Sequence, residues 1–183
     1  MIETARLVLR PPAQEDLAFR LAALNTPEVT RHLGGVATPE QLAERHARDM
    51  AAFADHGIGF WTVTLRETGA PVGRCGLGSI GPKAPAPIVG KREIGWTLAA
   101  TAWGRGYARE AASAVLDHAF RVLADDEVWG QTSDSNAASS TLMRRLGFAR
   151  RGDLDYVDDD YPPQDNPTTV YRLARADWME MDR

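Results

Sequence analysis

The clearest pattern of hydrophobic and polar positions in the chain lies at residues 108–123, where apolar side chains recur at spacings of three and one. These spacings put the apolar residues on one stripe of a helix, with polar side chains such as Arg109 and Asp117 opposite. We therefore predict an amphipathic helix with one buried face. Its apolar positions are Ala108, Ala111, Ala112, Val115, Leu116, Ala119, Phe120 and Leu123.

Three further helices are predicted. One lies around residues 17–24, and a second covers residues 39–54 with Thr38 as N-cap and Pro39 as its first residue. The third runs from Asn136 to Gly147, which stands in the C-cap position. Residues 81–90 contain three prolines and predict a loop. Strands are predicted at residues 6–10, 60–65, 72–80, 93–98, 128–133, 148–157 and 168–173.

The order of these elements predicts the fold class. The strand–helix–strand stretch from Glu93 to Ser133 should be a right-handed crossover that joins parallel neighbours. The other strands have short links, which are typical of antiparallel pairs. We expect an α/β (α+β) fold with a mixed, mostly antiparallel sheet of about seven strands flanked by helices. No repeat or linker divides the chain, so residues 1–183 are predicted to form a single domain.

Composition narrows the function classes. The net charge of −4 argues against a nucleic-acid-binding surface, and a single cysteine, Cys75, excludes an internal disulfide framework. No basic and apolar leader starts the chain, and no apolar run approaches the ~20 residues that cross a bilayer. We therefore expect a cytoplasmic protein. The four histidines are scattered without ligand spacing, so no metal is expected.

A glycine-containing segment, residues 103–109, precedes the strongest helix. Gly104 and Gly106 permit a tight turn, and free N–H groups at a helix N-terminus suit a phosphate. The alternatives are a simple glycine turn and a dinucleotide-binding fingerprint. The second is weak, because Arg109 replaces the third glycine and the acidic pair Asp125 and Asp126 precedes a strand.

Two polar residues stand at the start of the predicted 136–147 helix. Asn136 can cap this helix, or it can offer its amide to a ligand. Ser139 lies beside it, one turn into the helix.

Together these segments resemble the GNAT superfamily of N-acetyltransferases. More narrowly, the sequence is similar to the branch that contains the bacterial ribosomal-protein N-terminal acetyltransferases RimJ and RimL. The resemblance spans nearly the whole chain, in order and with family-like spacing. The matching stretches are residues 4–11, 93–98 and 103–108, and the pattern of Asn136, Ser139, Leu142, Arg145, Gly147 and Phe148.

The resemblance implies acetyl-CoA as co-substrate. In that family the backbone of the glycine loop binds the CoA pyrophosphate, and the preceding strand pairs with pantetheine as though it were a further strand. The Asn on the later strand–helix turn also contacts pantetheine, which implicates Asn136. The loop residues are Gly104, Arg105, Gly106, Tyr107 and Ala108, and the strand residues are Trp96, Thr97 and Leu98.

The sequence departs from the superfamily pattern at three positions. Thr101 stands where many members have Gln or Arg before the loop. Gln131 replaces a glutamate base, and Met143 replaces the tyrosine that often protonates the leaving thiolate. The resemblance to the RimJ/RimL-like branch makes Ser139 the candidate acid or thiol-orienting group. The alternative is a helix serine with no catalytic part.

Glu93 is the candidate general base, because several superfamily members hold their base at the start of this strand. The alternative is a strand-edge glutamate paired with Arg92 or Lys91. The resemblance implies direct attack of a neutral amine on the thioester. Cys75 has no evident base partner, which argues against a cysteine nucleophile.

The acceptor remains open between a protein N-terminal α-amine and small amines such as polyamines or aminoglycosides. Deprotonating a lysine amine at pH 7 costs about 4.6 kcal/mol and an α-amine only about 1–1.4 kcal/mol, so missing acid and base residues favour α-amines. A catalytically inactive acetyl-CoA-binding module is the other alternative, and a homodimer is a family-level expectation. Six aspartates at positions 153, 155, 158, 159, 160 and 165 form either a solvated acidic loop or an attractant for cationic acceptors.

Overall fold

The computed structural model describes residues 1–181, and the chain packs as two compact units. Unit 1 comprises Met1–Leu77 and Gly95–Val115, and unit 2 comprises Gly78–Ile94 and Leu116–Arg183. The division falls within β4 (Pro71–Ser79), β5 (Arg92–Leu98) and α3 (Tyr107–Asp117), so each unit contains a part of these three elements. The single domain expected from the sequence stays a prediction.

Unit 1 contains an antiparallel run of strands. β1 (Ile2–Glu3), β2 (Leu7–Arg10), β3 (Phe60–Leu65), β4 (Pro71–Ser79) and the second half of β5 are neighbours in that order. The register pairs Leu9 with Val63, and both side chains are fully buried. Arg10 pairs with Thr62, so these two side chains project to the other face.

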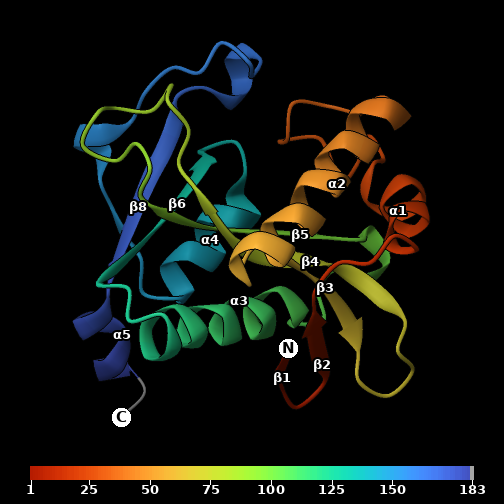
Figure 1. The fold of residues 1–183 in the computed structure, drawn as a ribbon. Helices are drawn as coiled ribbons and strands as arrows, with labels where there is room; N and C mark the ends of the chain where they lie inside the picture. Colours follow the sequence, from red (N-terminus) through yellow and green to blue (C-terminus); the bar gives the residue numbers. More distant parts are fainter. Residues whose placement is uncertain (182–183) are drawn as a thin grey trace. The chain divides into compact units, whose positions relative to one another are not determined.

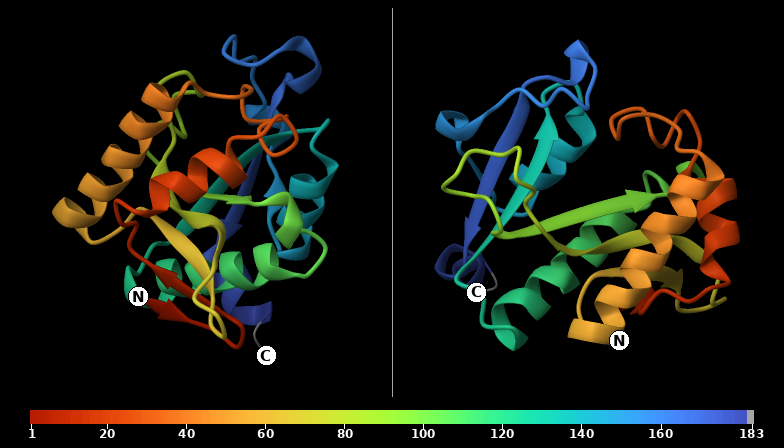
Figure 2. Two further views of the ribbon diagram at one scale, coloured as in Figure 1. Left: turned by 90° about the vertical axis from the view of Figure 1, so that its right-hand side faces the viewer. Right: turned by 45° about the horizontal axis from the view of Figure 1, so that its top comes forward.

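Helices α1 (Asp16–Phe19) and α2 (Pro39–His56) lie side by side in both views of Figure 2. A π-helical segment, η1 (Arg20–Leu24), continues α1. The Thr38 hydroxyl accepts a hydrogen bond from the Gln41 N–H at 3.2 Å, which confirms Thr38 as N-cap. Asp16 fixes α1 to the sheet, because its buried carboxylate accepts hydrogen bonds from Arg10 and Thr62.

Unit 2 contains the only parallel pair of strands found among the described residues. β5 pairs with β6 (Glu127–Ser133) through Glu93 and Trp129. β6 pairs antiparallel with β8 (Thr168–Ala174) along its whole length, and β8 pairs with β7 (Ala149–Arg150). Figure 1 shows β6 and β8 side by side, with α4 (Ala137–Arg145) next to β6. The predicted parallel crossover is therefore confirmed, through α3 (Tyr107–Asp117) and a π-helical segment, η3 (His118–Val122).

Two details differ from the sequence-based expectations. The predicted strand 148–157 is wrong beyond β7, because a 3₁₀ turn, η4 (Gly152–Leu154), interrupts it. The Asp155 side chain then accepts the hydrogen bond of the Val170 N–H at 2.9 Å, which replaces a backbone pairing. Gly147 follows the C-cap residue Leu146 and has φ 86°.

The sequence patterns also missed two short terminal elements, β1 and α5 (Arg175–Met181). β1 raises the strand count to eight. The fold class is confirmed as a mixed α/β fold whose strands are mostly antiparallel, with one parallel pair among the described residues. Two 3₁₀ helices, η2 (Ala100–Ala102) and η5 (Pro163–Asp165), complete the elements.

Candidate active site

The glycine loop in unit 1 leads directly into α3. Gly104 and Gly106 have φ values of 72° and 79°, a region that disfavours side chains with a Cβ. Helix α3 begins at Tyr107, so the N–H groups of its first turn lack intrahelical acceptors. Together with the helix dipole, these groups make the loop suitable for an anion such as a pyrophosphate.

The second half of β5 precedes this loop, and within unit 1 it is the last strand of the order. The Ala99 N–H donates to the Val72 carbonyl at 2.9 Å, which ties the end of the strand to β4. The Trp103 indole N–H donates to the Leu98 carbonyl at 2.9 Å and so links the strand to the glycine loop. In unit 1, the structure thus brings together the predicted strand residues, Trp96, Thr97 and Leu98, and the predicted loop.

Glu93 lies in unit 2, where it pairs with Trp129. Its half-buried carboxyl accepts a hydrogen bond from the Gln131 backbone N–H. Burial raises the pKa of Glu93 to about 7, and this single hydrogen bond opposes the shift only in part. Lys91 and Arg92 pair instead with Glu127 and Asp125, so the ion pairs that the sequence allowed for Glu93 are absent from residues 1–181.

Gln131 and Tyr156 complete the surroundings of Glu93. The Gln131 side-chain amide donates to the Tyr156 hydroxyl at 2.9 Å, while the Gln131 backbone binds Glu93. Burial raises the pKa of Tyr156, and the charges of Asp158 and Glu93 add to the shift. Sequence reasoning missed Tyr156, because it treated residues 148–157 as an ordinary strand and contained no signal for this contact.

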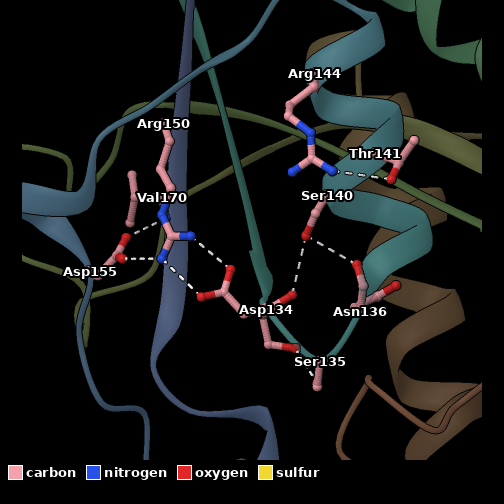
Figure 3. A network of polar contacts seen from close by, with 10 residues as sticks. Asp134, Ser135, Asn136, Ser140, Thr141, Arg144, Arg150, Asp155 and Val170 are labelled. Atoms are coloured by element: carbon pink, nitrogen blue, oxygen red, sulfur yellow. Dashed lines mark hydrogen bonds and ion pairs between the residues drawn. The ribbon is translucent and has the colours of Figure 1, made fainter.

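The turn between β6 and α4 places Asn136 and Ser139 together (Figure 3 shows the neighbourhood of Asn136). The Asn136 side-chain oxygen accepts a hydrogen bond from the Ser139 N–H at 3.2 Å and caps α4. The Ser140 hydroxyl donates to the carbonyls of Asn136 and Ser133, which fixes the turn to the end of β6. Ser139 itself is half-buried, and its hydroxyl has no hydrogen-bond partner among the described residues.

Met143 stands at the position of the tyrosine acid in the superfamily, and it is a core residue here. It is buried to 2% exposure and packs on Gly130, where a Cβ would collide with the Met143 methyl group. Cys75 is fully buried, and this burial raises the pKa of its thiol to about 12. Its thiolate is therefore not available as a nucleophile at neutral pH.

The acidic segment, residues 153–165, is largely neutralised by cations from outside it. Asp153 pairs with Arg151 at 2.7 Å, and Asp155 pairs with Arg150 at 2.6 Å. Figure 3 shows Arg150 between Asp134 and Asp155. Two further members, Asp158 and Asp160, share Lys83, and Asp165 is buried against Ser133 and Ser135.

Two other features are absent from residues 1–181. No group of three or more His, Cys, Asp or Glu side chains in this range could hold a metal ion. Within the same range, no helix has the length and apolar character that a membrane span requires.

Comparison with known proteins identifies the family. Residues 6–149 match the acetyltransferase (GNAT) domain, and the chain belongs to this family. The chain is 26% identical over 178 residues to the uncharacterized N-acetyltransferase YoaA of Bacillus subtilis (strain 168), covering 96% of this chain and 97% of that protein. It is 30% identical over 189 residues to the FsC-acetyl coenzyme A-N(2)-transacetylase of Aspergillus fumigatus, covering 100% of this chain and 79% of that protein.

A solved structure agrees with these relatives. The acetyltransferase from Agrobacterium tumefaciens str. C58 has a TM-score of 0.77 and 30% sequence identity, covering 94% of this chain and 92% of that chain. The chain is therefore an acetyl-CoA-dependent N-acetyltransferase of the GNAT type.

Proposed function

We propose that this acetyltransferase acts on primary amines of low pKa, such as protein N-terminal α-amines, with Glu93 as general base. The observation that carries the proposal is the half-buried Glu93 carboxyl, whose pKa of about 7 suits a base at neutral pH. The hydrogen bond from the Gln131 N–H supports it, because it stabilises the charged form of this carboxylate.

The difference in pKa between the Glu93 carboxyl and the acceptor ammonium favours an α-amine over a lysine side chain. Moving a proton from an α-ammonium, pKa ~7.7–8.0, to a carboxylate with a pKa of about 7 costs about 1–1.4 kcal/mol. The same transfer from a lysine ammonium, pKa ~10.4, costs about 4.6 kcal/mol. A base of this strength therefore serves α-amines well and lysines poorly.

The remaining residues take the parts that the family resemblance implies. Acetyl-CoA supplies the thioester that the amine attacks. As the amine nitrogen bonds to the acetyl carbon, Glu93 takes the amine proton and the carbon–sulfur bond breaks. Ser139 gives its hydroxyl proton to the leaving thiolate, or orients it, and regains a proton from water. Its half-buried hydroxyl, for which residues 1–181 provide no hydrogen-bond partner, supports this part.

We assign the co-substrate contacts to main-chain groups and one amide. The N–H groups of Gly104, Arg105, Gly106, Tyr107 and Ala108 bind the pyrophosphate, and the positive φ of both glycines supports this. The backbone of Trp96, Thr97 and Leu98 pairs with pantetheine along the edge of β5. Asn136 adds its amide nitrogen, because its oxygen already caps α4.

A small amine is the second candidate acceptor, and the name of the Aspergillus fumigatus relative, a FsC-acetyl coenzyme A-N(2)-transacetylase, favours it. The RimJ/RimL-like branch, the cytoplasmic location, the absence of a metal and the homodimer stay predictions from the sequence.

The test is amine-dependent thiol release from acetyl-CoA with matched acceptors. One peptide has a free α-amine and no lysine, and its twin has a blocked N-terminus and one lysine; spermidine and an aminoglycoside complete the set. We expect the first peptide to give the highest kcat/KM. Preference for the lysine twin contradicts the low-pKa proposal, and preference for a small amine supports the second candidate. Binding of acetyl-CoA without any turnover would support a non-catalytic module.

A further inference from the structure

Arg6 lies between β1 and β2 and reaches the first turn of α3 in unit 1. Its backbone N–H donates to Glu110 Oε1 at 2.8 Å, and its Nε donates to Glu110 Oε2 at 2.7 Å. Its Nη2 lies 2.7 Å from the same Oε2 atom. The Thr4 hydroxyl also donates to Glu110 Oε1, at 2.6 Å. Glu110 therefore holds the arginine side chain in one orientation.

From this position Arg6 contacts Arg105 and Tyr107 of the glycine loop and lies close to Gly106 between them. Its Nη1 donates to the Arg105 carbonyl at 3.0 Å. A Cβ on Gly106 would lie 3.4 Å from its Nη2, and its guanidinium carbon lies 4.8 Å from the centre of the Tyr107 ring. One side chain thus spans the part of the loop with the greatest backbone freedom.

We propose that Arg6 is a positioning residue for the pyrophosphate of acetyl-CoA, which it serves by fixing the glycine loop. This inference rests on the proposed function, because it takes the loop as the pyrophosphate site. The geometry of the peptide bond gives the reason. In a trans peptide the carbonyl and the following N–H point in opposite directions. Since the Arg105 carbonyl points to Arg6, the Gly106 N–H of the same peptide points away from Arg6, which suits it to binding an anion.

The charge of Glu110 gives Arg6 a second task. Glu110 lies in the first turn of α3, where an unpaired carboxylate would repel a pyrophosphate. Burial alone would raise the pKa of Glu110, but the hydrogen bonds from Thr4 and Arg6 outweigh it and lower this pKa. The carboxylate is therefore ionised, and Arg6 neutralises it.

The exposure of Arg6 argues against a role in folding alone. Its side chain is 50% exposed, against 17% for Glu110, and solvent around the guanidinium reduces what the ion pair contributes to stability. Arg66 offers a matched control on the same segment, because it donates to the Thr4 carbonyl at 3.1 Å and pairs with Glu3. The contacts of Arg66 that the structure shows do not reach the glycine loop.

The experiment compares acetyl-CoA with acetyl-pantetheine, which has the same thioester but no pyrophosphate. For Arg6→Ala we expect KM for acetyl-CoA to rise roughly 10-fold with kcat nearly unchanged, as the loss of a positioned charged hydrogen bond implies. The kcat/KM for acetyl-pantetheine should stay within about twofold. Arg66→Ala should leave both substrates unaffected.

Two additional variants test how Arg6 acts. Arg6→Lys keeps the charge that neutralises Glu110 but loses the planar fork that fixes the loop, so it should restore only part of the acetyl-CoA affinity. In the double variant Arg6→Ala/Glu110→Gln, the loss should be smaller than that of Arg6→Ala alone, because no unpaired carboxylate repels the pyrophosphate, but it should not vanish, because the loop is still not fixed.

An equal loss for both substrates, or no loss for either, overturns the inference. If the wild-type protein acetylates no amine, the proposed acceptor chemistry fails separately. The same comparison, made with dissociation constants of CoA and pantetheine, then still tests Arg6.

Discussion

The glycine-loop region of unit 1 and the Glu93 region of unit 2 each contain a half-buried glutamate, and the pKa values of these two carboxyls move in opposite directions. Burial acts on both. Glu110 receives hydrogen bonds from Thr4 and Arg6, which lower its pKa, whereas Glu93 receives one from a neutral N–H and its pKa is raised to about 7. Several hydrogen bonds, from Thr4 and from Arg6, therefore keep one glutamate ionised, whereas a single hydrogen bond leaves the other poised to exchange a proton.

Among the variants that test this contrast, replacing Glu93 should have the largest effect on activity. We expect Glu93→Gln to lower kcat/KM for an α-amine roughly 10²–10³-fold at pH 8, because it removes the general base. The wild-type pH profile of kcat/KM should show an inflection near pH 7 that the variant lacks. An unchanged profile would exclude Glu93 as the base.

The same variant should be more stable than the wild type at alkaline pH. The folded-state pKa of Glu93 lies above its ordinary value of 4.5, so its contribution to stability is complete below about pH 4.5 and is lost as pH rises through 7. Glu93→Gln should therefore raise the free energy of unfolding at pH 8 by up to about 3 kcal/mol, and change it little at pH 4.5. Thermal unfolding at both pH values measures this.

Glu127→Gln is the matched control on the adjacent strand. Burial alone would raise the pKa of Glu127, but hydrogen bonds from Arg172, Lys91 and Trp129 lower it to about 2. Its stabilising contribution is present above about pH 4.5 and lost as pH falls through 2. The control should thus lose stability at neutral pH while keeping its acetyltransferase activity.

Replacing Ser139 should have the next largest effect. We expect Ser139→Ala to lower kcat about 10-fold, because a thiolate leaving group needs less help from an acid than an alkoxide does. The KM for acetyl-CoA should change little. Thr141→Val, two residues further along α4, should alter kcat less than about twofold. If Ser139→Ala behaves like this control, Ser139 is a helix serine with no catalytic part.

Adding a second carboxylate beside Glu93 sharpens the comparison further. Gln131→Glu removes the amide that donates to Tyr156 and places a like charge near Glu93. The repulsion should move the apparent pKa of the pair upward by about one unit, and lower kcat/KM about fivefold at pH 7. Recovery of the rate at pH 9 distinguishes this shift from misfolding. A profile that does not move would contradict the proximity of the two groups.

The acidic segment should show the smallest effect. Neutralising Asp158, Asp159 and Asp160 together as asparagines should change the KM of a cationic acceptor by less than about twofold. The reason is that Lys83 already pairs with two of these three side chains. Lys83→Ala is the informative counterpart, because it uncovers their charge and should lower that KM. A large, salt-dependent rise in KM for the triple variant would show that the segment attracts acceptors.

Local signals explain why much of the fold could be predicted. The Thr38 cap, the parallel crossover and the loop at 81–90 all depend on interactions between residues close in sequence, or on the period of apolar positions. The continuous strand expected at residues 148–157 failed because η4 interrupts it, and beyond η4 the Asp155 side chain binds the Val170 N–H while only Tyr156 pairs with β8 through its backbone. Nothing in the local pattern separates those two outcomes.

By itself, the sequence determined the order of the elements, the glycine loop before α3 and the family to which the chain belongs. It also pointed to Glu93, but it left open whether Lys91 or Arg92 pairs with this residue. Only the tertiary structure decided that those cations bind Glu127 and Asp125, that Gln131 links Glu93 to Tyr156, and that Arg6 holds the loop. Backbone geometry and apolar period are local properties of a chain, whereas a carboxyl pKa depends on burial and charges brought together from distant positions.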